Sequence, residues 1–216
     1  TARDLGSPRS INGNGGDDTF KSGDNSFHNW QITGSNAGSV GNTTFTAIEN
    51  LTGGSDDDAF VFANGASLTG KIDGGGQTTK DTLNYGASAS AVTIDLGTLT
   101  SIEEIIGSLS NGNDTLLASA ATSFTINAKN AGLAGSIAFA NIENLTGSTS
   151  NDIFTFTSTG SLTGTAGVNG NSGTTDSLVL STLDESIVLT DPSTTGFKGS
   201  VSAPSTVTNF TNINSI

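Results

Sequence analysis

Apolar and polar residues alternate in short stretches that are separated by Gly, Asn, Asp and Ser. The clearest stretches are Phe60-Val61-Phe62 and Phe154-Thr155-Phe156, and each follows a turn-like segment rich in Asp, Asn or Ser. Alternation with a period of two between turn residues is typical of strands. No window of about 11 residues keeps the three-and-four spacing of an amphipathic helix. The sequence therefore predicts many short strands and almost no helix.

The same pattern occurs twice along the chain. Residues 45–53 return as residues 139–147, an offset of 139 − 45 = 94. Residues 67–70 and 161–164 keep that offset, and with one inserted residue Asp81-Thr82-Leu83 matches Asp176-Ser177-Leu178. Self-similarity of this length predicts a tandem duplication, with repeats of about 105 residues at 1–105 and 106–216.

A smaller motif recurs inside each repeat. A turn rich in Gly, Asn, Asp or Ser ends in Asp, which is followed by one residue and then a large apolar residue. The aspartates of this motif are Asp18, Asp58, Asp81, Asp114, Asp152 and Asp176. The motif marks the places where strands are expected to begin.

Composition limits the fold that these strands can build. Only 33% of the 216 residues are hydrophobic, and Gly contributes 29 residues. Repeated short strands with few apolar residues favour a parallel β-solenoid, in which turns stack and a thin core is filled by one or two apolar side chains per strand. The alternative is a β-sandwich, which explains the alternation but not the open-ended repeat.

Charge and cysteine content exclude several functions. The net charge is 7 − 20 = −13, so no basic face is expected for nucleic acid. Cysteine is absent, which excludes disulfides, thiol catalysis and cysteine-based metal sites. No run of about 18 apolar residues predicts a membrane span. Cations, or surfaces bridged by cations, are the expected partners.

One segment suggests a family. Ile48-Glu49-Asn50-Leu51-Thr52-Gly53-Gly54-Ser55-Asp56-Asp57-Asp58-Ala59-Phe60, followed by Ile72-Asp73-Gly74-Gly75-Gly76 and Asp81-Thr82-Leu83-Asn84-Tyr85, resembles repeats of large secreted bacterial surface proteins. These are adhesin-like proteins with filamentous-haemagglutinin-like or haemolysin-type (RTX-like) calcium-binding repeats. The resemblance covers nearly the whole chain and implies a β-solenoid on the bacterial cell surface or outside the cell.

The chain departs from the calcium-binding nonapeptide pattern, in which consecutive turns nine residues apart sandwich each ion. Its Gly-rich turns are separated by tens of residues, so any site must form between turns that meet in the fold. Calcium prefers hard oxygen ligands. The candidate ligands are Asp56, Asp57, Asp58, Asp17, Asp18 and Asp73. The alternative is that these aspartates bond the local backbone of their turns.

Other candidate residues point less directly to chemistry. Glu49 and Glu143 are equivalent in the two repeats, and Glu103 corresponds to Asn214. Paired carboxylates suit a glycosidase, but carboxylates that repeat with the scaffold favour a structural role. His28 and Trp30 are the only His and Trp. They are candidates for stacking on a sugar, although packing at the end of the fold is the simpler expectation.

The ends of the chain suggest assembly. Its last residues alternate, end in an apolar residue and match residues 99–105, after which the repeat continues with a counterpart of the N-terminal segment. Stacked strands normally need a polar cap, and neither end resembles one. We expect identical chains to stack head to tail and to form filaments. The expected interface residues are Phe210, Ile213, Ile216, Ile11 and Phe20.

Three functions follow from these expectations. The first is a non-catalytic structural subunit of an extracellular bacterial fibre, matrix or surface layer, with calcium as the candidate cofactor. The second is a stalk or ligand-binding segment of a large adhesin, with a cell-surface or matrix polysaccharide as partner. The third is a carbohydrate-active β-helix enzyme.

Overall fold

The computed structural model describes residues 9–23, 26–110, 112–181, 186–193, 196–202 and 206–215. Within these ranges the regular structure is strand, apart from one 3-10 turn at Leu96–Thr98. The expected all-β class is confirmed, and most strands pair in parallel within large sheets. The chain divides into unit 1, residues 1–90 with 98–104, and unit 2, residues 91–97 with 105–216.

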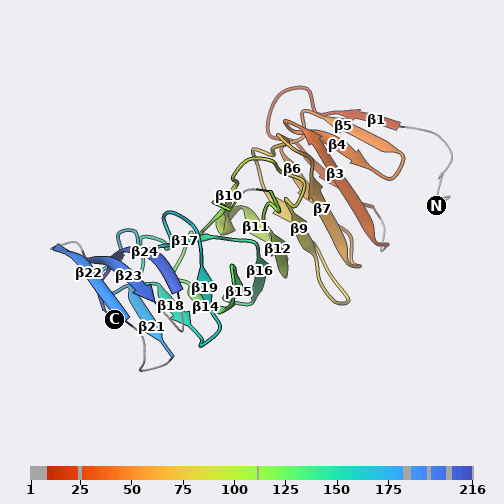
Figure 1. Ribbon diagram of the computed structural model, residues 1–216. Helices are drawn as coiled ribbons and strands as arrows, with labels where there is room; N and C mark the ends of the chain where they lie inside the picture. The colour runs from red at the N-terminus through yellow and green to blue at the C-terminus, as the bar shows by residue number, and fades with distance from the viewer. Residues whose placement is uncertain are drawn as a thin grey trace. The chain divides into compact units, whose positions relative to one another are not determined.

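In the described residues of unit 1 the structure has ten short strands, most of which are labelled in Figure 1. They are β1 (Arg9–Asn12), β2 (Thr19–Lys21), β3 (His28–Gly34), β4 (Ala37–Val40), β5 (Thr43–Thr46), β6 (Asn50–Thr52), β7 (Asp58–Phe62), β8 (Ile72–Asp73), β9 (Thr82–Asn84) and β11 (Leu99–Thr100). One sheet of unit 1 has the order β1-β5-β4-β3-β7-β9, and the other has the order β11-β8-β6-β2. In the first sheet β4 pairs antiparallel with β3 and with β5. β7 pairs in parallel with β3 and with β9.

Part of this pairing pattern recurs in unit 2. Its strands are β10 (Thr93–Asp95), β13 (Thr115–Leu117), β14 (Ser123–Ala128), β15 (Ala131–Ala134), β16 (Ile137–Ala140), β17 (Asn144–Thr146), β18 (Ile153–Phe156), β19 (Ser161–Leu162), β20 (Val168–Asn169), β21 (Ser177–Leu180), β22 (Ser186–Ser193), β23 (Gly196–Ser202) and β24 (Thr206–Ile213). β15 pairs antiparallel with β14 and with β16. β18 pairs in parallel with β14 and with β21. The strand β12 (Glu104–Ile106) falls at the division between the units.

Strand register places large apolar side chains in rows. In unit 1 Trp30 lies opposite Phe60, and Phe60 lies opposite Leu83. In unit 2 the corresponding row is Phe124, Phe154 and Leu178. All six side chains are at most 1% exposed, and the Phe124 and Phe154 rings stack with centroids 5.0 Å apart. Because alternate residues of a strand point to the same face, the two-residue period of the sequence builds this core.

The C-terminal strand has neighbours on both sides. β24 pairs in parallel with β19 and β20 and antiparallel with β23, and β22 forms the outer edge of this sheet. Phe210 and Ile213 are fully buried in unit 2. β24 is therefore not the open end that the sequence suggested. Ile216 lies outside the described residues.

The N-terminal strand β1 differs in this respect. It pairs in parallel with β5 and ends the first sheet of unit 1. Ile11 on β1 is 36% exposed, whereas Phe20 on β2 is half-buried and packs edge-on against Trp30, with ring centroids 5.1 Å apart. Among the described residues, no helix could cross a membrane.

Candidate functional site

The six aspartates of the recurrent motif occupy equivalent turns, here called the Asp turns. Each Asp turn runs from a glycine to the aspartate that precedes or begins a strand, as from Gly53 to Asp58 and from Gly147 to Asp152. Five of the aspartates are at most 1% exposed, and Asp18 is half-buried. A buried carboxylate needs compensating donors, so the contacts of these oxygens determine what the turns can do.

Several of these aspartates accept, through one carboxylate oxygen, a hydrogen bond from the backbone of a neighbouring turn. In unit 1 His28 N–H donates to Asp58 Oδ1 at 2.7 Å, Asp58 N–H donates to Asp81 Oδ1 at 2.6 Å, and Asp81 N–H donates to Glu103 Oε2 at 2.8 Å. We call this series the acceptor ladder. The ladder satisfies backbone donors at strand starts with side-chain oxygens.

Unit 2 contains the same ladder with one change. Thr122 N–H donates to Asp152 Oδ1 at 2.7 Å, and Asp152 N–H donates to Asp176 Oδ1 at 2.9 Å. Asp176 N–H then donates to Asn214 Oδ1 at 2.8 Å. A neutral amide therefore fills the position that Glu103 has in unit 1.

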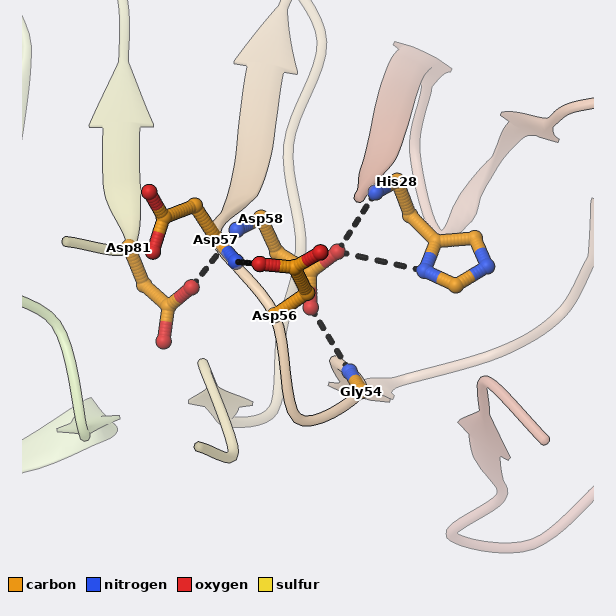
Figure 2. A network of polar contacts seen from close by, with 6 residues as sticks. All are labelled: His28, Gly54, Asp56, Asp57, Asp58 and Asp81. Atoms are coloured by element: carbon orange, nitrogen blue, oxygen red, sulfur yellow. Dashed lines mark hydrogen bonds and ion pairs between the residues drawn. The ribbon is translucent and has the colours of Figure 1, made fainter. Parts of the chain in front are cut away.

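The second carboxylate oxygen divides the Asp turns into two kinds. In the closed turns, Asp58, Asp114 and Asp152 accept through Oδ2 from the N–H groups of Gly54, Ser108 and Ser148. Figure 2 shows Asp58 held in this way between Gly54 and His28. Both oxygens of a closed-turn carboxylate are thus bonded to backbone donors.

In the open turns this second oxygen has no hydrogen-bond partner. The three oxygens are Asp18 Oδ2, Asp81 Oδ2 and Asp176 Oδ2. The N–H group that would reach each of them donates instead to a side chain two residues earlier. These pairs are Asn14 to Asn12 at 2.9 Å, Gly75 to Asp73 at 3.0 Å and Asn171 to Asn169 at 2.9 Å.

Burial changes the acidity of this network. Desolvation is the main cause that raises the pKa of Asp81 to about 6, and the nearby carboxylates of Asp58, Glu103 and Asp57 add to it. Desolvation likewise raises the pKa of Asp114, Glu143 and Asp176. The N–H of Thr79 is the main cause that lowers the pKa of Asp57, although desolvation opposes it.

The predicted calcium ligands do not converge on an ion site. Asp57 Oδ1 accepts from the N–H groups of Thr78, Thr79 and Lys80 at 2.6–3.1 Å, and Asp56 Oδ1 accepts from Asp57 N–H at 3.0 Å. Asp17 accepts from Asn50 Nδ2 at 2.6 Å. Among the described residues, no three His, Cys, Asp or Glu side chains form a group that could hold a metal. The named oxygens of Asp56, Asp57 and Asp17 thus accept hydrogen bonds within the chain. Asp18 Oδ2, by contrast, is buried and has no hydrogen-bond partner.

The glutamates that suggested catalysis also serve the backbone. Glu49 and Glu143 accept through Oε2 from Asp18 and Asp114 N–H, each at 3.0 Å. Their Oε1 atoms accept from the side-chain amides of Asn36 and Asn130, at 3.0 and 2.9 Å. Asn36 and Asn130 adopt positive φ angles of 51° and 54°, which Asn tolerates better than most residues. The glutamates therefore repeat with the scaffold.

His28 and Trp30 both face the interior of unit 1. Trp30 is fully buried and stacks on Phe60, with ring centroids 5.7 Å apart. His28 Nδ1 lies 3.2 Å from Asp58 Oδ1. A buried ring of Trp30 cannot stack on a sugar from solvent, so this pair contributes to packing.

A hollow of about 460 Å³ lies on unit 1, lined by Asp17, Glu49, Asn50, Thr69, Gly70, Lys71 and Thr98. Most of its polar atoms are already bonded within the chain. Asn50 Nδ2 donates to Asp17, and Asn50 Oδ1 accepts from Lys71 N–H at 2.8 Å. In unit 2 the counterparts of Asp17 and Lys71 are Asn113 and Thr165, which bond each other at 3.0 Å.

Sequence reasoning recognised the motif aspartates but did not identify Asp81, Asp114, Asp152 and Asp176 as the residues that connect the turns. The signal was the Asp that precedes each strand, combined with the Glu or Asn that recurs further along. No family model, curated protein or solved structure matches this chain. The function must therefore be inferred from the contacts themselves.

Proposed function

We propose that the chain is a non-catalytic β-solenoid subunit of an extracellular bacterial fibre, matrix or surface layer. The observation that supports this proposal best is the acceptor ladder, since Asp58 and Asp152 each link the turn before them to the turn after them. Such links suit a stack of turns. The parallel strand pairs favour a solenoid over a β-sandwich, whose sheets are antiparallel.

The proposed partner is a second copy of the chain, which pairs with the outer edge of β1. Arg9 and Gly13 N–H groups donate to the Asn42 and Thr46 carbonyls of the β5 side. Because backbone groups alternate along a strand, those of Ser10 and Asn12 point the other way. No described strand covers that edge. The complementary edge is β22, which ends its sheet in unit 2. Strand addition of this kind takes its strength from main-chain bonds.

Light scattering of the purified chain and of a Ser10→Pro variant tests the proposal. Proline removes the outward N–H and is tolerated on an edge strand, so we expect the variant to fold but to lose assembly. The control is Leu109→Ser, which removes the most exposed large apolar side chain of the described residues, at 73%, and leaves the strand edges intact. The control should assemble like the wild type.

The same experiment addresses the alternative function. A chain that stays monomeric at all concentrations would contradict self-assembly and favour a stalk segment of a larger adhesin. The hollow on unit 1 supports that alternative, because Asp17 and Lys71 give it charges that unit 2 lacks. A bacterial surface or matrix polysaccharide is its proposed ligand, and a binding isotherm with Lys71→Thr as control distinguishes this function.

A further inference from the structure

The closed and open Asp turns make different demands on their carboxylates. In a closed turn, Asp152 accepts Thr122 N–H on one oxygen and Ser148 N–H on the other, at 2.7 Å each. Ser148 Oγ also donates to the second oxygen at 3.1 Å. The Asp152 side chain is fully buried. A cation that bound this carboxylate would have to displace these hydrogen-bond donors. The closed turn is complete without an ion.

An open turn retains one unbonded oxygen. Asp176 Oδ2 is buried and has no hydrogen-bond partner, while Asp176 Oδ1 accepts Asp152 N–H. If a cation bound in unit 2, this oxygen is where it would bind. Calcium needs six to eight oxygen ligands, however, and no metal-holding group of three acidic or imidazole side chains occurs in the described ranges.

The two repeats provide natural substitutions at these turns. Ser150 and Asn151 replace Asp56 and Asp57, and Asn214 replaces Glu103. Asn151 Oδ1 accepts from Thr174 and Thr175 N–H at 3.2 and 3.1 Å, as Asp57 Oδ1 does from Thr78 and Thr79. A neutral oxygen therefore suffices at these positions. The affinity of a calcium site, by contrast, depends on the number of charged ligands.

We propose that the aspartates of the Asp turns are fixed acceptors of backbone N–H groups that take the place of ions between successive turns, so that the fold needs no divalent cation. This inference is independent of self-assembly. Closed turns require a carboxylate, because two acceptor oxygens face donors from both sides. Open turns require only one acceptor oxygen, which an amide also supplies.

The test compares Asp152→Asn with Asp176→Asn in the full chain, each with millimolar calcium or with a chelator. In Asp152→Asn the new amide N–H group faces the Ser148 N–H, so we expect the thermal midpoint to fall by about 5–10 °C. In Asp176→Asn the new amide N–H group can take the position of Oδ2, which has no hydrogen-bond partner, and leave Oδ1 as the acceptor of Asp152 N–H. We expect its midpoint to match or exceed that of the wild type.

Calcium is expected to change none of these midpoints, and calorimetry of the wild type with calcium alone is expected to show no binding. A midpoint that rises with calcium in the wild type but not in Asp176→Asn would overturn the proposal, because it would place an ion at the open turn. Equal losses in both variants would also contradict it. If Asp152→Asn does not fold, that loss agrees with the proposal, and wild-type calorimetry still decides whether calcium binds.

Discussion

At the scale of single residues, side-chain oxygens of Asp, Asn and Glu serve as hydrogen-bond acceptors for backbone N–H groups. Glu103 and Asn214 accept the same kind of N–H group at the same distance of 2.8 Å. A bond from a buried backbone N–H to a side-chain oxygen avoids the cost of an unpaired donor. The oxygen therefore matters more than the charge at these positions.

Asp57 tests this interchange. An Asp57→Asn change keeps the acceptor oxygen for Thr78 and Thr79, as Asn151 does in the second repeat. We expect Asp57→Asn to lower the thermal midpoint less than Asp57→Ala does, because only the alanine variant removes the acceptor of these N–H groups. Thermal unfolding followed by circular dichroism measures both. A loss in Asp57→Asn as large as in Asp57→Ala would show that the negative charge is required.

At the scale of elements, the turns stack closely because glycine occupies their first position. A Cβ at Gly107 would collide with the Asn141 carbonyl and come within 2.8 Å of Asp114 Oδ2. Gly53, Gly74, Gly147 and Gly170 lie against the carbonyls of neighbouring turns in the same manner. Close approach of two backbones explains these glycines, whose φ angles are ordinary.

Gly107→Ala should therefore destabilise unit 2. The methyl group forces the Gly107 and Asn141 backbones apart, and we expect a loss of about 2–4 kcal/mol of unfolding free energy. Urea unfolding measures this loss. Gly112→Ala is the matched control, because its nearest neighbour is Glu143 Cγ at 3.9 Å, and its loss should be below about 1 kcal/mol. Similar losses in both variants would contradict the steric explanation.

Much of the element pattern could be predicted from the sequence. Alternation located strands such as β7 and β18, and the duplicated segments correspond to equivalent hydrogen bonds of Asn36 and Asn130. The pairing of β24 with β23 could not be predicted, since an antiparallel strand alternates like a parallel one. The contacts of the Asp turns could not be predicted either. They depend on which N–H groups the register of neighbouring strands brings to each carboxylate.

At the scale of the whole molecule, charge governs stability and association. The net charge of −13 means that copies of the chain repel each other. Salt weakens this repulsion, because the Debye length is about 10 Å at 0.1 M ionic strength. The buried carboxylates add a dependence on pH, because a carboxylate with a raised pKa is destabilising when it is charged.

Stability should rise as the pH falls from neutral. The folded pKa of Asp81 is about 6, above its ordinary value of 3.8, so its contribution is complete below pH 3.8 and is lost as the pH rises through 6. Asp114, Glu143 and Asp176 shift in the same direction. We expect the thermal midpoint to be higher at pH 5 than at pH 7.5, and Asp81→Asn to reduce this difference. A midpoint that falls between pH 7.5 and pH 5 would contradict this assignment.

Assembly should increase with ionic strength. If copies meet at the edges of β1 and β22, screening of their negative charge lowers the barrier to association while the main-chain bonds remain. Light scattering between about 20 mM and 500 mM NaCl should therefore show larger particles at high salt. Sodium sulfate at equal ionic strength is the control, because screening depends on the ionic strength and not on which salt supplies it. Particles that dissociate at high salt would indicate an interface held by ion pairs.

The acceptor ladder has a consequence for how such a chain changes length. In the ladder, Asp58, Asp81, Asp152 and Asp176 each accept an N–H from one neighbouring turn and donate their own N–H to the next acceptor, which is Asp, Glu or Asn. The same type of hydrogen bond therefore joins successive turns of the ladder. Recombination between similar gene segments could add or remove whole turns and leave a foldable product, so related chains are expected to differ in the number of turns more than in their design.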